Sequence, residues 1–171
     1  MISERLKSET RHLHDLTEAK FNSSKIFEGN FGIEDYRKLL VYNYFLLKNF
    51  EDAVFAQIPT ESAEKLELEK RRKLPLILQD FEALGMAVPS LPISVEVENE
   101  ADAWGIFYVM EGSTLGGNMI AKQLSKSELF KDFPFHYFRC YGNETGSYWK
   151  NFKEILVEIN EKIGGVYQVY F

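Results

Sequence analysis

A helical pattern over residues 97–124 contains the run Glu111-Gly112-Ser113-Thr114-Leu115-Gly116-Gly117. Each glycine costs a helix about 1 kcal/mol relative to alanine, so some interaction must offset three of them. Small residues recur four positions apart within the run, as Gly112 with Gly116 and Ser113 with Gly117. They form a strip on which a flat ligand could lie against the backbone, with the helix kinked over it. The alternative is a close crossing with another helix, and the spacing alone leaves both open.

A second pattern lies near the start of the chain, where residues 4–20 are expected to form a helix. Lys7, Arg11, His14 and Glu18 are spaced so that they lie within about 60° of one another on that helix. Neutral imidazole is a standard axial ligand of heme iron, and a ligating His usually donates its other ring N–H to an acceptor such as a carboxylate. The alternative is a solvated helix face with ordinary surface charges.

The control for this stripe is His12, which lies about 200° around the helix from His14 and is expected to be a surface residue. The apolar side of the same helix is expected to consist of Leu6, Leu13 and Leu16.

The rest of the chain also has helical rather than strand periodicity. Helices are expected over residues 4–20, 33–57, 61–73, 75–84, 97–124 and 146–162, with connections at 22–32, 86–95 and 125–145, and the remaining C-terminal residues could form one more helix. The expectation is a single all-α domain over 1–171. Residues 61–73 are rich in charge and are expected to be a solvated helix, whose basic island Lys70-Arg71-Arg72-Lys73 could dock an acidic redox partner.

Composition narrows the classes of function. The chain has 171 residues and a net charge of -6, which argues against nucleic acid as the main partner. Its one cysteine, Cys140, allows no internal disulfide and no multi-cysteine metal site. The absence of a signal-like or membrane-spanning apolar run is typical of a cytoplasmic protein, and no membrane span is expected.

Taken together, the motifs resemble those of the heme oxygenase family. Leu6-Lys7-x-x-Thr10-x-x-x-His14-x-x-x-Glu18 resembles its proximal helix, and residues 108–117, Tyr-Val-Met-Glu-Gly-Ser-Thr-Leu-Gly-Gly, resemble its distal helix in the bacterial form. Further matches are Leu78-x-Asp80-x-x-x-Leu84-Gly85 and Arg139-Cys140-Tyr141-Gly142, the latter followed by Gly146, Trp149 and Phe152. The resemblance spans residues 4 to about 157.

The resemblance implies an all-α fold that holds heme between a proximal N-terminal helix and a kinked, glycine-rich distal helix. It implies that His14 is the proximal iron ligand, that Glu18 orients it, and that Lys7 meets a propionate. Candidates for the second propionate are Arg11, Lys150 and Lys153. The distal face would consist of Gly112, Ser113, Gly116 and Gly117, and Phe107 stands where many members have a propionate-binding Tyr.

The activity that the resemblance implies is cleavage of heme by dioxygen to biliverdin, ferrous iron and carbon monoxide. Electrons would come from an external donor of the ferredoxin or flavodoxin type or another reductase. One alternative is a heme carrier with the same site and no turnover. Another is a thiaminase-like enzyme of the same fold, which would need a nucleophilic cysteine, here Cys140.

Overall fold

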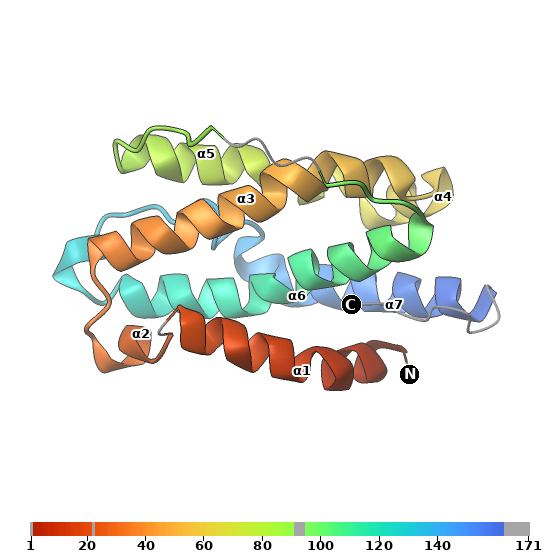
Figure 1. Ribbon diagram of the computed structural model, residues 1–171, viewed down its shortest axis with the longest axis horizontal. Helices are drawn as coiled ribbons and strands as arrows, with labels where there is room; N and C mark the ends of the chain where they lie inside the picture. Colours follow the sequence, from red (N-terminus) through yellow and green to blue (C-terminus); the bar gives the residue numbers. More distant parts are fainter. Residues whose placement is uncertain (1, 22, 91–94, 163–171) are drawn as a thin grey trace.

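The structure, a computed structural model, describes residues 2–21, 23–90 and 95–162. Within these ranges the chain forms helices and connections and no strand, which confirms the all-α class (Figure 1). The elements are α1 (Ile2–Lys20), α2 (Ser24–Glu28), α3 (Ile33–Gln57), α4 (Thr60–Leu66), the 3-10 turn η1 (Leu68–Arg71), α5 (Leu74–Ala83), α6 (Glu100–Leu124), the 3-10 turns η2 (Glu128–Phe130) and η3 (Gly142–Glu144), and α7 (Thr145–Lys162). The helix expected after residue 162 lies outside the described residues.

Helix α6 is the centre of the fold, because it packs against both α3 and α7. Aromatic side chains fill these contacts. The ring of Phe107 on α6 lies 5.5 Å from that of Phe55 on α3 and 5.0 Å from that of Phe152 on α7. Figure 1 shows α5 outside α3, and α1 on the opposite side of the molecule along α6 and α7. The high aromatic content therefore serves mainly the packing around α6.

Helix α6 begins at Asn99, whose side chain accepts a hydrogen bond of 3.0 Å from the backbone N–H of Asp102. The helix continues through Gly112, Gly116 and Gly117 to Leu124, so these three glycines bend the helix without ending it. In Figure 1 the ribbon of α6 changes direction between its green and cyan parts.

The prediction of one solvated helix over residues 61–73 is wrong. Helix α4 stops at Leu66, Glu67 adopts a left-handed backbone with a φ of 50°, and the short turn η1 follows. Arg71 and Lys73 are each only 1% exposed. The basic island therefore does not present four cations to a partner. The charged residues suggested a solvated helix because the sequence pattern does not show that Arg71 and Lys73 pair with the buried carboxylate of Glu111 on α6.

The connection between η2 and α7 is held in place by a buried acid on α5. Asp80 is fully buried, and its carboxylate accepts hydrogen bonds from the backbone N–H groups of His136 (2.8 Å) and Tyr137 (3.0 Å). Burial raises the pKa of Asp80, and the two backbone donors oppose that rise. Phe135, just before these donors, has a φ of +52°. Asp80 therefore fixes an irregular turn that no regular hydrogen-bond ladder supports.

Among the helices that the structure describes, none is both long and apolar enough to cross a membrane.

We expect Asp80→Ala to lower the free energy of unfolding by about 2–5 kcal/mol, because two buried backbone N–H groups lose their acceptor. Asp80→Asn keeps one carbonyl acceptor and should lose less. Glu82→Ala, an exposed acid on the same helix, should change stability by about 0.5 kcal/mol or less. Urea unfolding of the three variants measures this. Equal losses for Asp80→Ala and Glu82→Ala would contradict the role given to Asp80.

Candidate functional site

Helix α1 is packed at its two ends. Leu6, near its start, is 2% exposed, and the helix contacts α7. Just beyond its end, the ring of Phe21 lies 4.8 Å from that of Tyr42 on α3, edge to face. Between these anchors, every residue from 11 to 20 is exposed. Contacts near Leu6 and at Phe21 therefore hold α1 in place, while its C-terminal half is left uncovered.

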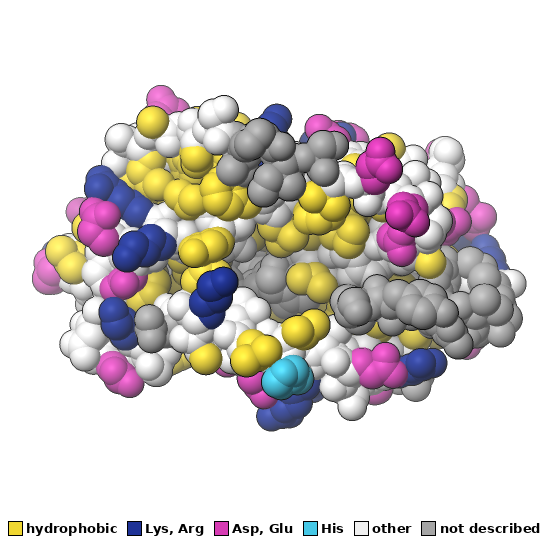
Figure 2. Space-filling model, in the orientation of Figure 1, with side chains coloured by type: hydrophobic (Ala, Val, Ile, Leu, Met, Phe, Trp, Pro, Cys, Tyr) yellow, Lys and Arg dark blue, Asp and Glu magenta, His cyan; other side chains and the backbone are white. Residues whose placement is uncertain are grey.

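The uncovered part includes the side of α1 that faces inward. Leu13 lies about 20° from Leu6 around the helix axis and His14 about 80°. Leu13 is nevertheless 49% exposed, and Leu16 is 53% exposed. Of the three leucines expected to make the apolar side of this helix, only Leu6 is buried. In Figure 2 hydrophobic side chains lie at the surface over the middle of α1, next to a histidine. Apolar surface gathered in this way is typical of a binding site.

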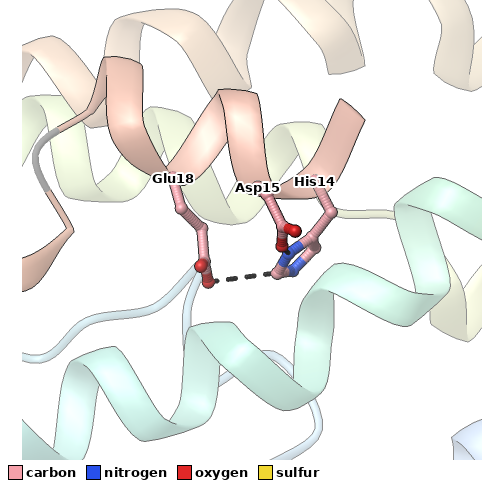
Figure 3. Close-up of side chains that lie close together, drawn as sticks. All are labelled: His14, Asp15 and Glu18. Atoms are coloured by element: carbon pink, nitrogen blue, oxygen red, sulfur yellow. Dashed lines mark ion pairs between the residues drawn. The ribbon is translucent and has the colours of Figure 1, made fainter. Parts of the chain in front are cut away.

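His14, Asp15 and Glu18 project from α1 on the same side (Figure 3). Nδ1 of His14 lies 3.8 Å from a carboxylate oxygen of Asp15, and Nε2 lies 3.8 Å from one of Glu18. Both separations exceed hydrogen-bond length, so the ring is not locked in one orientation. Whichever nitrogen binds a metal, a carboxylate is close to the other. Ligand atoms of the three residues lie within 4.8 Å of one another, and all three side chains are exposed.

The other members of the N-terminal stripe are also on the surface. Lys7 is exposed, and Arg11 forms a loose ion pair with Asp15 at 4.0 Å. His12 is exposed as well. The charged side chains of this stripe are therefore all at the surface of α1.

Helix α6 also carries an uncovered face. Val109, Leu115 and Met119 are 42%, 40% and 60% exposed, and Gly116 is exposed between them. Leu115 and Met119 also line an open groove toward the start of α7, together with Lys122, Gly142 and Gly146. Gly116 follows Val109 by seven residues and Met119 follows Gly116 by three, so these positions lie on one side of α6, with Leu115 at its edge.

The three glycines in the run from Glu111 to Gly117 on α6 have different surroundings. A Cβ atom on Gly117 would lie 2.8 Å from Cδ1 of Phe138, too close for the ring to stay where it is. A Cβ on Gly112 would touch the ring of Trp149 at 3.5 Å, which is an ordinary contact. A Cβ on Gly116 would meet nothing within 4 Å. Close packing therefore explains Gly117, whereas Gly116 faces open space.

Two further predicted site residues occupy different environments. Ser113 is exposed on α6, and its hydroxyl donates a hydrogen bond of 2.9 Å to the carbonyl of Met110. Phe107 is fully buried and packs in the aromatic core against Phe55 and Phe152. Its ring therefore does not reach the face of α6 that carries Gly116.

A buried charged cluster next to this face was not found from the sequence. Glu111, 1% exposed, forms ion pairs with Arg71 and Lys73 and accepts a hydrogen bond of 2.8 Å from the hydroxyl of Tyr141. Burial raises the pKa of Tyr141, and the carboxylate of Glu111 adds to that rise. A signal was present in the sequence, because a Glu within an apolar helix requires buried partners.

A small, partly open cavity lies behind α6. It has a volume of about 20 Å³ and is lined by Asn43, Lys73, Ser113, Thr114, Gly117, Tyr137, Phe138 and Cys140. Burial raises the pKa of the Cys140 thiol to about 11, so the thiol stays protonated at neutral pH and is a poor nucleophile. This observation weighs against the thiaminase-like alternative.

Comparison with known proteins agrees with the motifs. The family model for heme oxygenase matches residues 1–163. The chain is similar to a heme oxygenase of Xanthomonas campestris pv. campestris (strain 8004), with 30% identity over 129 residues, which cover 75% of this chain and 76% of that protein. No solved structure matches the chain with significance.

The different surroundings of Gly116 and Gly117 give a stability prediction. Gly116→Ala should raise the free energy of unfolding by about 0.5–1 kcal/mol, because alanine favours the helix and its methyl group has free space. Gly117→Ala should be less stable than Gly116→Ala by about 1–3 kcal/mol, because its methyl group forces the Phe138 ring to move. Thermal and urea unfolding of the heme-free variants measures the difference. Equal stability of the two variants would show that Phe138 does not require a glycine at position 117.

Proposed function

The chain belongs to the heme oxygenase family, and from this premise we propose that it cleaves heme with dioxygen to biliverdin, ferrous iron and carbon monoxide. At the level of the family it is an oxidoreductase that acts on heme. The electrons come from an external donor of the ferredoxin or flavodoxin type, or another reductase.

The observation that carries this proposal is the uncovered inward side of α1. Leu13 and Leu16 are about half exposed on a helix whose two ends are packed, and Gly116 on α6 has free space where a side chain would stand. A flat, apolar ligand between the two helices would cover this surface. The residues present therefore fit a heme.

The proposed roles follow from the chemistry of each side chain. His14 would bind the heme iron, and Asp15 or Glu18 would accept the N–H of the ring nitrogen that does not bind iron. Lys7 and Arg11 attract the propionates. A charge-assisted hydrogen bond to a partly exposed carboxylate contributes roughly 1.5–3 kcal/mol at best, so these cations mainly select the orientation of the heme within its plane.

Bound heme supplies the iron centre that activates dioxygen and is itself the molecule that is cleaved. On the α6 side, Gly116 leaves room for dioxygen and lets the helix backbone lie close to the ligand. The Ser113 hydroxyl is the polar side-chain group beside this face. With heme bound, this hydroxyl would hold a water molecule that supplies protons on the ligand side of α6.

One experiment distinguishes a heme oxygenase from a heme carrier of the same fold. The protein is mixed with hemin, and absorption is followed after ascorbate or a ferredoxin system is added in air. An oxygenase loses the Soret band and forms biliverdin, which chromatography identifies. A stable hemin spectrum under these conditions would overturn the proposed activity while leaving heme binding intact.

We expect His14→Ala to remove the histidine ligand. The Soret band and the ferrous carbon monoxide spectrum of the hemin complex should both change, and turnover should be lost. His12→Ala, on the other side of α1 and also exposed, is the matched control and should keep the wild-type spectra. If the His14→Ala complex retains a histidine-ligated spectrum, another residue binds the iron.

We expect Gly116→Leu to fill the space above the ligand. Biliverdin formation should fall by at least tenfold while the circular dichroism of the heme-free protein stays helical. Gly116→Ala adds only a methyl group and should retain more activity than Gly116→Leu. Normal turnover by the leucine variant would mean that the ligand does not lie against Gly116.

A further inference from the structure

Helix α7 carries a group of packed aromatic rings beside the glycine-rich part of α6. The indole of Trp149 stacks on the ring of Phe152, with centroids 5.6 Å apart and planes 11° from parallel. Its centroid also lies 5.4 Å from that of Tyr108 on α6. The same indole is the group that a Cβ atom on Gly112 would meet at 3.5 Å. Trp149 is half-buried, so these contacts fix its ring while part of the ring reaches the surface.

The ammonium group of Lys153 lies over this indole. Its Nζ is 5.6 Å from the centroid of the Trp149 ring, within the range of a cation–π interaction. Lys153 follows Trp149 by four residues on α7, so both side chains lie on one face of the helix. The side chain of Lys153 is half-buried, and within residues 2–21, 23–90 and 95–162 it pairs with no carboxylate. The cation is therefore held in place while its charge is not neutralised.

The other two candidates for the second propionate differ from Lys153 in both respects. Lys150 forms an ion pair of 3.7 Å with Glu154, and its side chain is 76% exposed. Arg11 lies 4.0 Å from Asp15, and its side chain is 77% exposed. Arg11 can attract a propionate by its charge, but holding a long, solvated side chain in one place costs conformational entropy. Lys153, which is half-buried and has no acid partner, gains most from an anionic ligand.

Lys7 and Lys153 lie toward the same end of the space between α1 and α6. Helices α1 and α7 are in contact, and in Figure 1 the N-terminal half of α1 runs beside α7. Glu4, one turn before Lys7, is close to Tyr108, because burial raises the pKa of Tyr108 and the charge of Glu4 adds to that rise. Tyr108 in turn packs against Trp149. Two cations from different helices thus flank these two rings, together with one exposed acid, Glu4.

The arrangement of charge on heme matches this pair of cations. Heme carries its two propionates on one edge, and the rest of its rim is apolar. Two cations at one end of the site therefore favour the orientation in which that edge lies near Lys7 and Lys153. Because the two lysines are on different helices, each can bind one carboxylate as a point charge.

We propose that Lys153, held over the indole ring of Trp149, binds the second propionate of the heme and, together with Lys7, sets the orientation of the heme within its plane. This inference rests on the proposed function and identifies a second anchor for the ligand. Lys153 is a binding residue, and Trp149 is a positioning residue that acts through it.

The first test compares hemin with hemin dimethyl ester, in which both carboxylates are blocked and the rest of the ligand is unchanged. The Soret band measures the affinity of the heme-free protein for each. Lys153→Gln should weaken hemin binding about tenfold, the size of one charge-assisted hydrogen bond, and should leave ester binding unchanged. Lys150→Gln, which changes an exposed lysine on the same helix, is the matched control and should change neither affinity.

Unchanged hemin affinity in Lys153→Gln, or an equal loss for hemin and the ester, would overturn the proposal. An equal loss would mean that Lys153 supports the fold and does not bind a carboxylate. A wild type that binds the ester as tightly as hemin would also overturn it. Lys153→Arg keeps the charge and should retain most of the preference for hemin. A protein that binds neither ligand would contradict the proposed function instead.

The second test asks whether the two lysines bind different carboxylates. If they do, the losses of hemin affinity in Lys7→Gln and Lys153→Gln should add in the double variant. Each single variant should also change the ratio of biliverdin isomers that chromatography separates. A double variant no weaker than either single variant, or an unchanged isomer ratio in Lys153→Gln, would contradict the proposal.

The third test concerns Trp149. Trp149→Leu removes the aromatic face and should reduce the preference for hemin over the ester, whereas Trp149→Phe keeps a ring and should retain more of it. In the Lys153→Gln background, Trp149→Leu should not reduce the preference further, because the cation that Trp149 positions is gone. A further reduction there would show that Trp149 does not act through Lys153. The Lys153 variants test the proposal even if Trp149→Leu does not fold.

Discussion

The position of α6 depends on one buried carboxylate. Glu111 stands directly before the glycine-rich part of the helix, where ion pairs with Arg71 and Lys73 and a hydrogen bond from Tyr141 hold it. Removing one partner of a buried ion pair typically costs about 3–5 kcal/mol, because the remaining charge is left without compensation. The cluster thus ties α6 to the turn after α4 and to the segment before α7. It fixes where the small residues of α6 begin.

This arrangement separates the two sides of α6. On the inner side, aromatic rings and the charged cluster fill the space between α3 and α7. On the outer side, Val109, Gly116 and Met119 remain uncovered. Helix α1 has the same division along its length, packed near Leu6 and open at residues 11–20. A ligand between α1 and α6 would complete the apolar packing that the chain itself leaves incomplete.

The glycines show how one motif can serve two physical requirements. The sequence spacing allowed either a surface for a ligand or a close packing contact. In the structure the surroundings differ from one glycine to the next. Gly117 has the ring of Phe138 against it, Gly112 touches Trp149, and only Gly116 faces free space. A run of small residues in a helix therefore need not have one explanation. Each residue has to be judged by what a Cβ atom would meet.

The sequence by itself determined the all-α class, the span of α3 at residues 33–57 and the stripe that carries His14, because helical periodicity is a local property. It also carried the motifs of the family. It did not determine that Arg71 and Lys73 are buried or that Leu13 and Leu16 are uncovered. Whether a side chain is buried depends on which distant residue packs against it. The sequence of a charged run is the same whether its side chains face water or pair with the buried Glu111. Only the tertiary structure decided these contacts, because they join residues about forty positions apart in the chain.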